Sequence, residues 1–131
     1  LLNKIEKEAA KIGREVPILL QLKIAEEESK YGLRVEELIA LCEKIANDSY
    51  PHIELRGLMG MASFTDNSEQ VEREFYKLSS LFEQMKSKYF SKDQNFKIRS
   101  MGMSGDYNIA LKQGSNMIRV GSSVFGPRPD Y

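Results

Sequence analysis

Residues 18–61 read ILLQLKIAEEESKYGLRVEELIALCEKIANDSYPHIELRGLMGM, and this stretch decides the fold. The apolar run Ile18–Ile24 follows Pro17 and predicts a largely buried strand. Apolar residues then recur on one face of a predicted helix over 35–46, and a second strand is predicted over 53–61. A strand, a helix and a strand in this order indicate parallel pairing through a right-handed crossover.

The same alternation continues on both sides of this unit. The other elements are predicted as helices over 5–12, 71–89 and 106–113 and as strands over 96–101 and 117–121. Gly13 and Gly114 end two of the helices, Asp66 with Glu69 begins the long one, and 126–129 is an exit linker. The order α-β-α-β-α-β-α-β predicts an α/β protein with a parallel sheet, as a small open sheet or as half of a (β/α)8 TIM-type barrel. We expect residues 1–131 to form a single domain.

The composition excludes several classes of protein. The chain has 131 residues, of which 41% are hydrophobic and 29% charged, as is typical of a globular domain. Nineteen basic residues balance nineteen acidic ones, so no attraction to nucleic acid or to an anionic membrane surface is predicted. No apolar run approaches the roughly 20 residues that cross a bilayer. Cys42 is the single cysteine, which excludes an intrachain disulfide, and a cytoplasmic location is expected.

A loop of small residues, Ser100–Asp106, leads from the strand predicted over 96–101 into the short helix predicted over 106–113. Backbone N–H groups before a helix attract anions, and glycines let a phosphate approach closely. Ser104 can add a hydroxyl donor. The alternative is that Ser104 or Asp106 only caps the helix.

A second candidate site lies in Met117–Ser123. Arg119 and Gly121 share one face of the predicted strand, and an arginine in a buried strand needs an acceptor. That acceptor is either a ligand beside the Gly121-Ser122 turn or a carboxylate inside a barrel. Because the loops after the last two strands often bind phosphate in (β/α)8 barrels, the two loops together favour a phosphate. Lys23 is expected at the barrel mouth, in contact with a ligand or in an ion pair.

Four patterns indicate a family. Residues 20–32 (LQLKIAEEESKYG) are similar to LLQxNIxxExxKxG, and residues 55–61 (LRGLMGM) are similar to LxGLMxI/M. Residues 100–110 (SMGMSGDYNIA) resemble LSMGMSxDxxxAI, and residues 114–126 (GSNMIRVGSSVFG) resemble GSTxVRIGTAIFG. In order, and along essentially the whole chain, these patterns resemble the pyridoxal phosphate homeostasis protein family, whose barrel is similar to the N-terminal domain of alanine racemase.

The resemblance implies that the chain corresponds to strands five to eight of that barrel. It places the phosphate of pyridoxal 5'-phosphate on Ser104, Gly121 and Ser122, and the pyridine nitrogen against Arg119, with Met101 and Gly102 lining the ring pocket. An arginine is always protonated, so it leaves that nitrogen unprotonated and weakens the cofactor as an electron sink. The lysine that forms a Schiff base with the cofactor stands in a first-strand VSK motif, which none of the lysines here matches.

By this resemblance the chain is a fragment of a protein that carries or buffers pyridoxal 5'-phosphate, and it is expected not to be an enzyme by itself. One alternative is an alanine-racemase-like enzyme that acts on amino acids, although the second racemase domain has no room in this chain. Another is a non-catalytic protein that binds a phosphate ligand. Because a half barrel leaves two open sheet edges, we expect either self-association or docking onto the missing N-terminal half.

Overall fold

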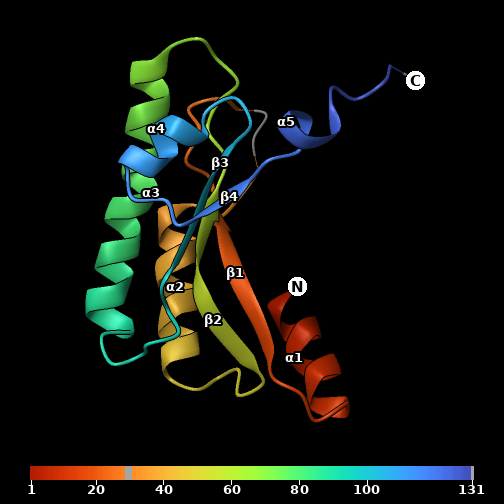
Figure 1. Cartoon of the computed structure of the whole chain (residues 1–131). Helices are drawn as coiled ribbons and strands as arrows, with labels where there is room; N and C mark the ends of the chain where they lie inside the picture. The colour runs from red at the N-terminus through yellow and green to blue at the C-terminus, as the bar shows by residue number, and fades with distance from the viewer. Residues whose placement is uncertain (29–30, 131) are drawn as a thin grey trace.

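Four parallel strands form one sheet in the order β1-β2-β3-β4. The computed structural model describes residues 1–28 and 31–130. The strands are β1 (Val16–Leu22), β2 (Ile53–Gly60), β3 (Ile98–Met103) and β4 (Met117–Arg119). The helices are α1 (Leu2–Lys11), α2 (Val35–Ala46), α3 (Ser68–Tyr89), α4 (Tyr107–Lys112) and α5 (Ser122–Phe125). The predicted α/β class with a parallel sheet is confirmed (Figure 1).

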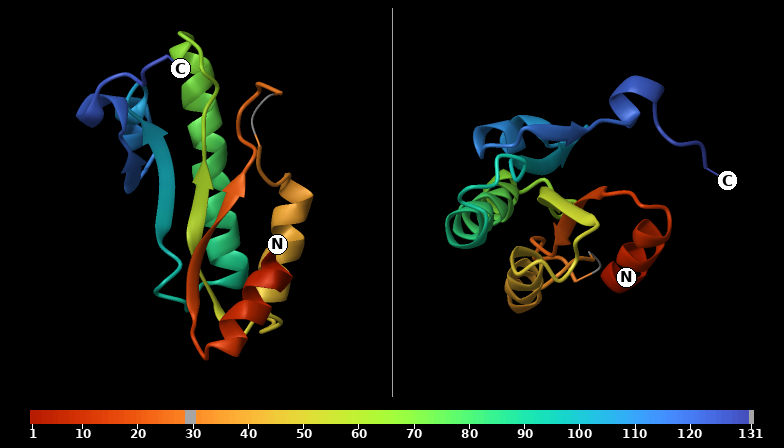
Figure 2. Two further views of the ribbon diagram at one scale, coloured as in Figure 1. Left: turned by 90° about the vertical axis from the view of Figure 1, so that its right-hand side faces the viewer. Right: turned by 90° about the horizontal axis from the view of Figure 1, so that it is seen from below.

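The core lies between the sheet and the helices α2 and α3, which cover one face of it (Figure 2). Leu20 and Leu22 of β1 face these helices, whereas Gln21 between them is half-exposed, as strand alternation requires. The buried residues of α3 follow helical spacing and are Val71, Glu74, Phe75, Leu78, Leu81, Phe82 and Met85. Within the described residues, no helix is both long and apolar enough to cross a membrane.

An irregularity between β1 and β2 changes the pairing register. Ile18 pairs with Leu55, but the next residue, Leu19, pairs with Gly57, so Arg56 is an extra residue in β2. Gly57 has φ +156°, and a Cβ there would lie 1.9 Å from the carbonyl oxygen of Ile98. Glycine is therefore required where β2 approaches β3.

The free edge of β1 is partly blocked within the chain. Leu33 of the loop before α2 donates to Gln21 O (2.8 Å) and accepts from Lys23 N (2.9 Å), so it occupies the upper end of this edge. Val16 N donates to His52 O, just before β2, so the N–H of Val16 points toward β2. Backbone N–H groups alternate in direction along a strand, so position 17 faces the free edge, and Pro17 has no N–H to donate there. The donors left on this edge are few.

Several predicted boundaries differ from the structure. The long helix is capped by Asn67, whose Oδ1 accepts from Gln70 N at 3.2 Å, and not by Asp66. β3 begins at Ile98 because Phe96 lies outside the ladder, stacked between Phe82 and Phe90 with ring centroids 4.8 and 4.6 Å away. The loop predicted over 26–32 is present, except that residues 29–30 lie outside the described residues.

The end of the sheet also differs from the prediction. β4 stops at Arg119 and not at residue 121, since Gly121 is the N-cap residue of the short helix α5, which the sequence pattern did not predict. β4 is an exposed edge strand, so Arg119 is not buried as expected.

Candidate functional site

The carboxyl ends of all four strands lie at one end of the sheet, where the connecting loops gather (Figures 1 and 2). β3 leads into Ser104 and β4 leads into Gly121. Because β3 and β4 are neighbours and run parallel, the loops that follow them lie side by side. Ligands of open α/β sheets bind at this end of the strands.

Ser104 joins the two loops. Its hydroxyl oxygen accepts hydrogen bonds from the backbone N–H groups of Gly121 and Ser123, each at 3.2 Å. Ser122 stands between these two residues, at the first position of α5, and is exposed. The structure thus brings together three of the predicted site residues and provides two N–H donors and two hydroxyl groups at one place.

Asp106 and Gly102 shape the loop that carries Ser104. Oδ1 of Asp106 accepts from Met103 N at 2.7 Å and makes no capping bond to α4, so the simple capping role is wrong for this side chain. Gly102 has φ +103°, and a Cβ there would lie 2.8 Å from Cβ of Ala110. Its backbone is therefore pressed against α4, which lets the loop turn sharply after β3.

Met101 is placed differently from the prediction. Its side chain is 2% exposed and belongs to the core between sheet and helices, so it does not line the open face of the sheet. The prediction that it lines a ring pocket with its side chain is not supported. Its carbonyl oxygen accepts from the Ser115 hydroxyl at 2.6 Å, which ties β3 to the start of β4.

Arg119 extends from the edge strand toward β2. Its Nη2 lies 3.4 Å from the sulfur of Met61, a weak acceptor. Among residues 1–28 and 31–130, no carboxylate forms an ion pair with Arg119. The alternative of a structural ion pair is therefore not seen among these residues.

Lys23 follows β1 on the same half-exposed face as Gln21. Its Nζ lies 3.3 Å from Oε2 of Glu28, whose side chain is almost fully exposed. Lys23 is thus in an ion pair within its own loop, but the pair is exposed and is not the interior ion pair that was the alternative for this residue. An exposed pair of this kind contributes little to stability and leaves the ammonium free to exchange partners.

Glu74 is the residue at this end of the sheet that the sequence analysis missed. Its carboxylate, on α3, accepts from Ser63 N (2.6 Å), Ser63 Oγ (2.8 Å), Glu26 N (2.9 Å) and Gln70 Nε2 (3.3 Å). Burial opposes its ionisation, but these hydrogen bonds outweigh burial and hold the pKa of Glu74 below its usual value. The available signal was a carboxylate on the apolar stripe formed by Val71, Phe75 and Leu78.

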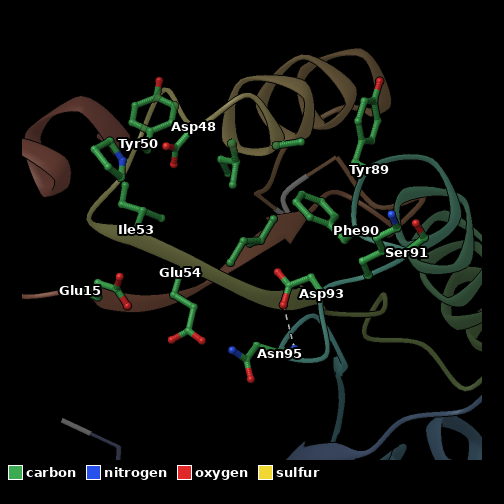
Figure 3. Close-up of a pocket in the computed structure, with 15 residues that line it drawn as sticks. Glu15, Asp48, Tyr50, Ile53, Glu54, Tyr89, Phe90, Ser91, Asp93 and Asn95 are labelled. Carbon is green, nitrogen blue, oxygen red and sulfur yellow. Dashed lines mark hydrogen bonds between the residues drawn. The ribbon is translucent and has the colours of Figure 1, made fainter.

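A second hollow, of about 620 Å³, lies at the opposite end of the sheet, where β2 and β3 begin (Figure 3). Carboxylates of Glu54 and Asp93 border it, and Asp93 Oδ1 accepts from Asn95 N at 2.9 Å. Within the described residues, no group of histidine, cysteine and acidic side chains is arranged to hold a metal ion. The amino ends of parallel strands are usually structural, so this hollow is not the candidate site.

Comparison with known sequences identifies related proteins over nearly the whole chain. Residues 1–129 match the family model described as the alanine racemase N-terminal domain. A pyridoxal phosphate homeostasis protein of Haemophilus influenzae is 42% identical over 111 residues, which are 85% of this chain and 45% of that protein. The human pyridoxal phosphate homeostasis protein is 39% identical over 115 residues, 87% of this chain and 41% of that protein. The chain thus spans about half the length of these relatives.

Solved structures show the same partial match. A crystal structure described as that of an unknown protein from Bifidobacterium adolescentis has a TM-score of 0.82 and 30% identity, covering 95% of this chain and 48% of the other. PipY of Synechococcus elongatus, determined without pyridoxal phosphate, has a TM-score of 0.84 and 24% identity, covering 95% of this chain and 56% of PipY. The second match supports the fold alone. PipY has also been solved with pyridoxal phosphate bound.

Proposed function

Since this chain belongs to the family of the alanine racemase N-terminal domain, we propose that it is the phosphate-binding half of a barrel that carries pyridoxal 5'-phosphate. The resemblance drawn from its motifs agrees with this membership. Relatives named as pyridoxal phosphate homeostasis proteins support a role in carrying or buffering the cofactor.

The four strands correspond, in this proposal, to strands five to eight of an eight-stranded barrel. Two observations support it: the chain matches about half of each longer relative, and its sheet is parallel, with β1 and β4 as edge strands. The loops that follow β3 and β4 are then the loops after strands seven and eight, where barrels of this type often bind phosphate.

The contact between Ser104 and the N–H groups of Gly121 and Ser123 carries the proposal. Two backbone donors and the hydroxyl groups of Ser104 and Ser122 match the needs of a phosphate, which accepts several hydrogen bonds at once. The oxygen that now accepts from the two N–H groups is the Ser104 hydroxyl, and a phosphate oxygen can replace it. Ser104 then turns its own O–H toward the phosphate.

Arg119 faces the pyridine nitrogen of the cofactor in this proposal. It stands on β4 two residues before Gly121, and its guanidinium lies within hydrogen-bond distance of the Met61 sulfur. As a permanent donor it binds that nitrogen in its unprotonated form, in which the cofactor is a weak electron sink. Carriage therefore fits this arrangement better than chemistry that needs a strong electron sink. The backbone of Gly102 packs closely against α4, next to the loop that carries Ser104.

The partner is either a second copy of the chain or the N-terminal half present in the longer relatives. An apolar groove of about 640 Å³ runs along the free edge of β1 and supports both possibilities. It is lined by Leu1, Leu2, Ile5, Ile18, Leu19, Leu20, Leu33 and Leu41, among others. At the other edge, Met117, Ile118 and Val120 of β4 and its extension are partly exposed.

Titration with pyridoxal 5'-phosphate, followed by its absorbance and by calorimetry, tests the proposal. Saturable binding that inorganic phosphate weakens by competition is expected. The absence of binding, in the chain alone and in the chain mixed with an N-terminal half from a relative, would overturn it. An amino-acid racemase assay on the same samples distinguishes carriage from a racemase, because only the latter releases the opposite enantiomer.

A further inference from the structure

Two loops at the ligand end of the sheet meet on one buried carboxylate. The β1 loop (residues 23–28) follows β1, and the β2 loop (residues 61–67) follows β2. Glu74 accepts from Glu26 N in the first loop and from both N and Oγ of Ser63 in the second. Although it carries a charge, Glu74 is 2% exposed. A buried carboxylate is costly unless such hydrogen bonds replace its water, so its partners are essential to it.

Further hydrogen bonds connect the same two loops directly. Ser63 Oγ accepts from Glu27 N at 3.3 Å, and Oε2 of Glu27 accepts from Phe64 N at 3.0 Å. Arg73, beside Glu74 on α3, reaches Glu26 Oε1 at 3.4 Å from the outside. Each of these bonds joins residues that are hydrogen-bonded to Glu74, or that stand next in the chain to Glu74 or to such a residue, so the network is built around one buried carboxylate.

We propose that Glu74 is a positioning residue that holds the β1 loop and the β2 loop together and so sets the inner face of the sheet for its ligand. The β2 loop begins with Met61, whose sulfur contacts the guanidinium of Arg119. The β1 loop begins with Lys23, which reaches Glu28 of the same loop. Fixing Ser63 and Glu26 therefore fixes the backbone from which these two side chains extend. We call the hydrogen bonds by which Glu74 joins the two loops the clamp. The role toward the ligand rests on the proposed binding of pyridoxal 5'-phosphate, whereas the clamp does not.

Only a carboxylate satisfies all four donors that surround Glu74. Its two oxygens accept from two backbone N–H groups, one hydroxyl and one amide. In a glutamine of the same size, one oxygen is replaced by an NH2 group, which is a donor and opposes the N–H groups on that side. Charge-assisted hydrogen bonds are also about twice as strong as neutral ones.

Hydrogen–deuterium exchange on the ligand-free chain tests the clamp. In Glu74→Gln we expect exchange of residues 24–28 and 61–65 to accelerate roughly tenfold, the equivalent of about one lost hydrogen bond to a charged group. Glu69→Gln, an exposed acidic residue on the same helix, is the matched control and should leave both loops unchanged. Unchanged exchange of both loops in Glu74→Gln would overturn the proposal.

Comparison with Glu74→Asp separates hydrogen bonding from packing. Aspartate keeps the charge and loses one methylene, whereas glutamine keeps the volume and loses the charge. If the carboxylate positions the loops, Asp retains more protection in both loops than Gln does; the reverse order would show a packing role and refute the proposal. Should Glu74→Gln fail to fold, Ser63→Ala decides, because it removes both the hydroxyl donor to Glu74 and the acceptor of Glu27 N. It should accelerate exchange in both loops, and unchanged exchange in both would overturn the proposal.

Binding of pyridoxal 5'-phosphate to the same variants tests the role toward the ligand. Affinity should fall roughly tenfold in Glu74→Gln, in step with the loosened loops. Unaltered affinity with loosened loops would refute positioning. If the parent chain binds no pyridoxal 5'-phosphate, the proposed function fails, but the loop protection still supports or refutes the clamp.

Discussion

The hydroxyl oxygen of Ser104 lies 3.2 Å from the backbone nitrogen of Gly121, although 17 residues separate them in the chain. This contact closes the loop after β3 onto the loop after β4. It places a hydroxyl group and backbone donors where an anionic group can bind, at the end of the sheet at which α/β proteins bind ligands.

Replacing Ser104 with alanine should weaken pyridoxal 5'-phosphate binding about tenfold or more, because a hydrogen bond to a charged group contributes roughly 1.5–3 kcal/mol. Fluorescence or calorimetric titration measures the change. Ser91→Ala, at the opposite end of the sheet, is the control and should bind as the parent does. Equal affinity of parent and Ser104→Ala would show that the phosphate binds elsewhere.

This chain should bind pyridoxal 5'-phosphate without a specific covalent bond. The lysine of the family motif has no counterpart here, and Lys23 is the lysine that follows a strand on the open face. After stoichiometric cofactor and borohydride, intact mass should remain that of the unmodified chain. A reduced adduct mapped to one peptide would contradict this, and Lys23 is the first residue to inspect.

The open edges should make the chain associate. Light scattering over a dilution series is expected to show a mass above that of the monomer at micromolar concentration, falling on dilution. Leu19→Pro is the variant of choice, because it removes a backbone donor from the free edge of β1. The N–H of Val16 points toward β2, and that of Leu19, three residues further on, points the opposite way. Leu20 is unsuitable, since its side chain is in the core. A well-folded monomer at all concentrations would show that Pro17 and Leu33 protect the edge sufficiently.

Gly57→Ala should destabilise the fold by about 1–3 kcal/mol or more, because the new Cβ meets backbone and the φ of +156° is unfavourable for other residues. Urea unfolding measures the free energy. Gly105→Ala is the control: a Cβ there meets nothing within 4 Å. A loss as large in the control as at Gly57 would mean that the close approach of β2 to β3 is not the cause.

Stability should depend on pH through Glu74. Its pKa in the folded chain lies below the usual 4.5, so its ionised form stabilises the fold above that pH. This contribution is lost as the pH falls below about 4.5 and through the folded-state pKa. Urea unfolding is measured from about pH 6 to about pH 3, which brackets the usual carboxyl pKa of roughly 4. Over this range Glu74→Gln should lose less stability than the parent. Parallel curves would show that Glu74 is not the group responsible.

The sequence by itself determined the order of the elements and the parallel sheet. The periodicity of a strand or helix is contained in a short stretch of sequence. The run Ile18–Ile24 and the apolar positions of α3 from Val71 to Met85 each indicate which face of the element is buried. Parallel topology then requires the loops after β3 and β4 to lie at the same end of the sheet, so the sequence predicts Ser104, Gly121 and Ser122 as neighbours.

Only the tertiary structure decided the features that depend on distant partners. Glu74 accepts from Glu26, 48 residues away, and its role follows from where α3 crosses two loops, which no local pattern contains. Phe96 lies outside the strand because the rings of Phe82 and Phe90 stack on it, and Arg119 is exposed because no strand covers β4. Met101 entered the core for the same kind of reason. Periodicity reports which residues share a face, but the identity of the atoms opposite that face depends on packing between elements far apart in the chain.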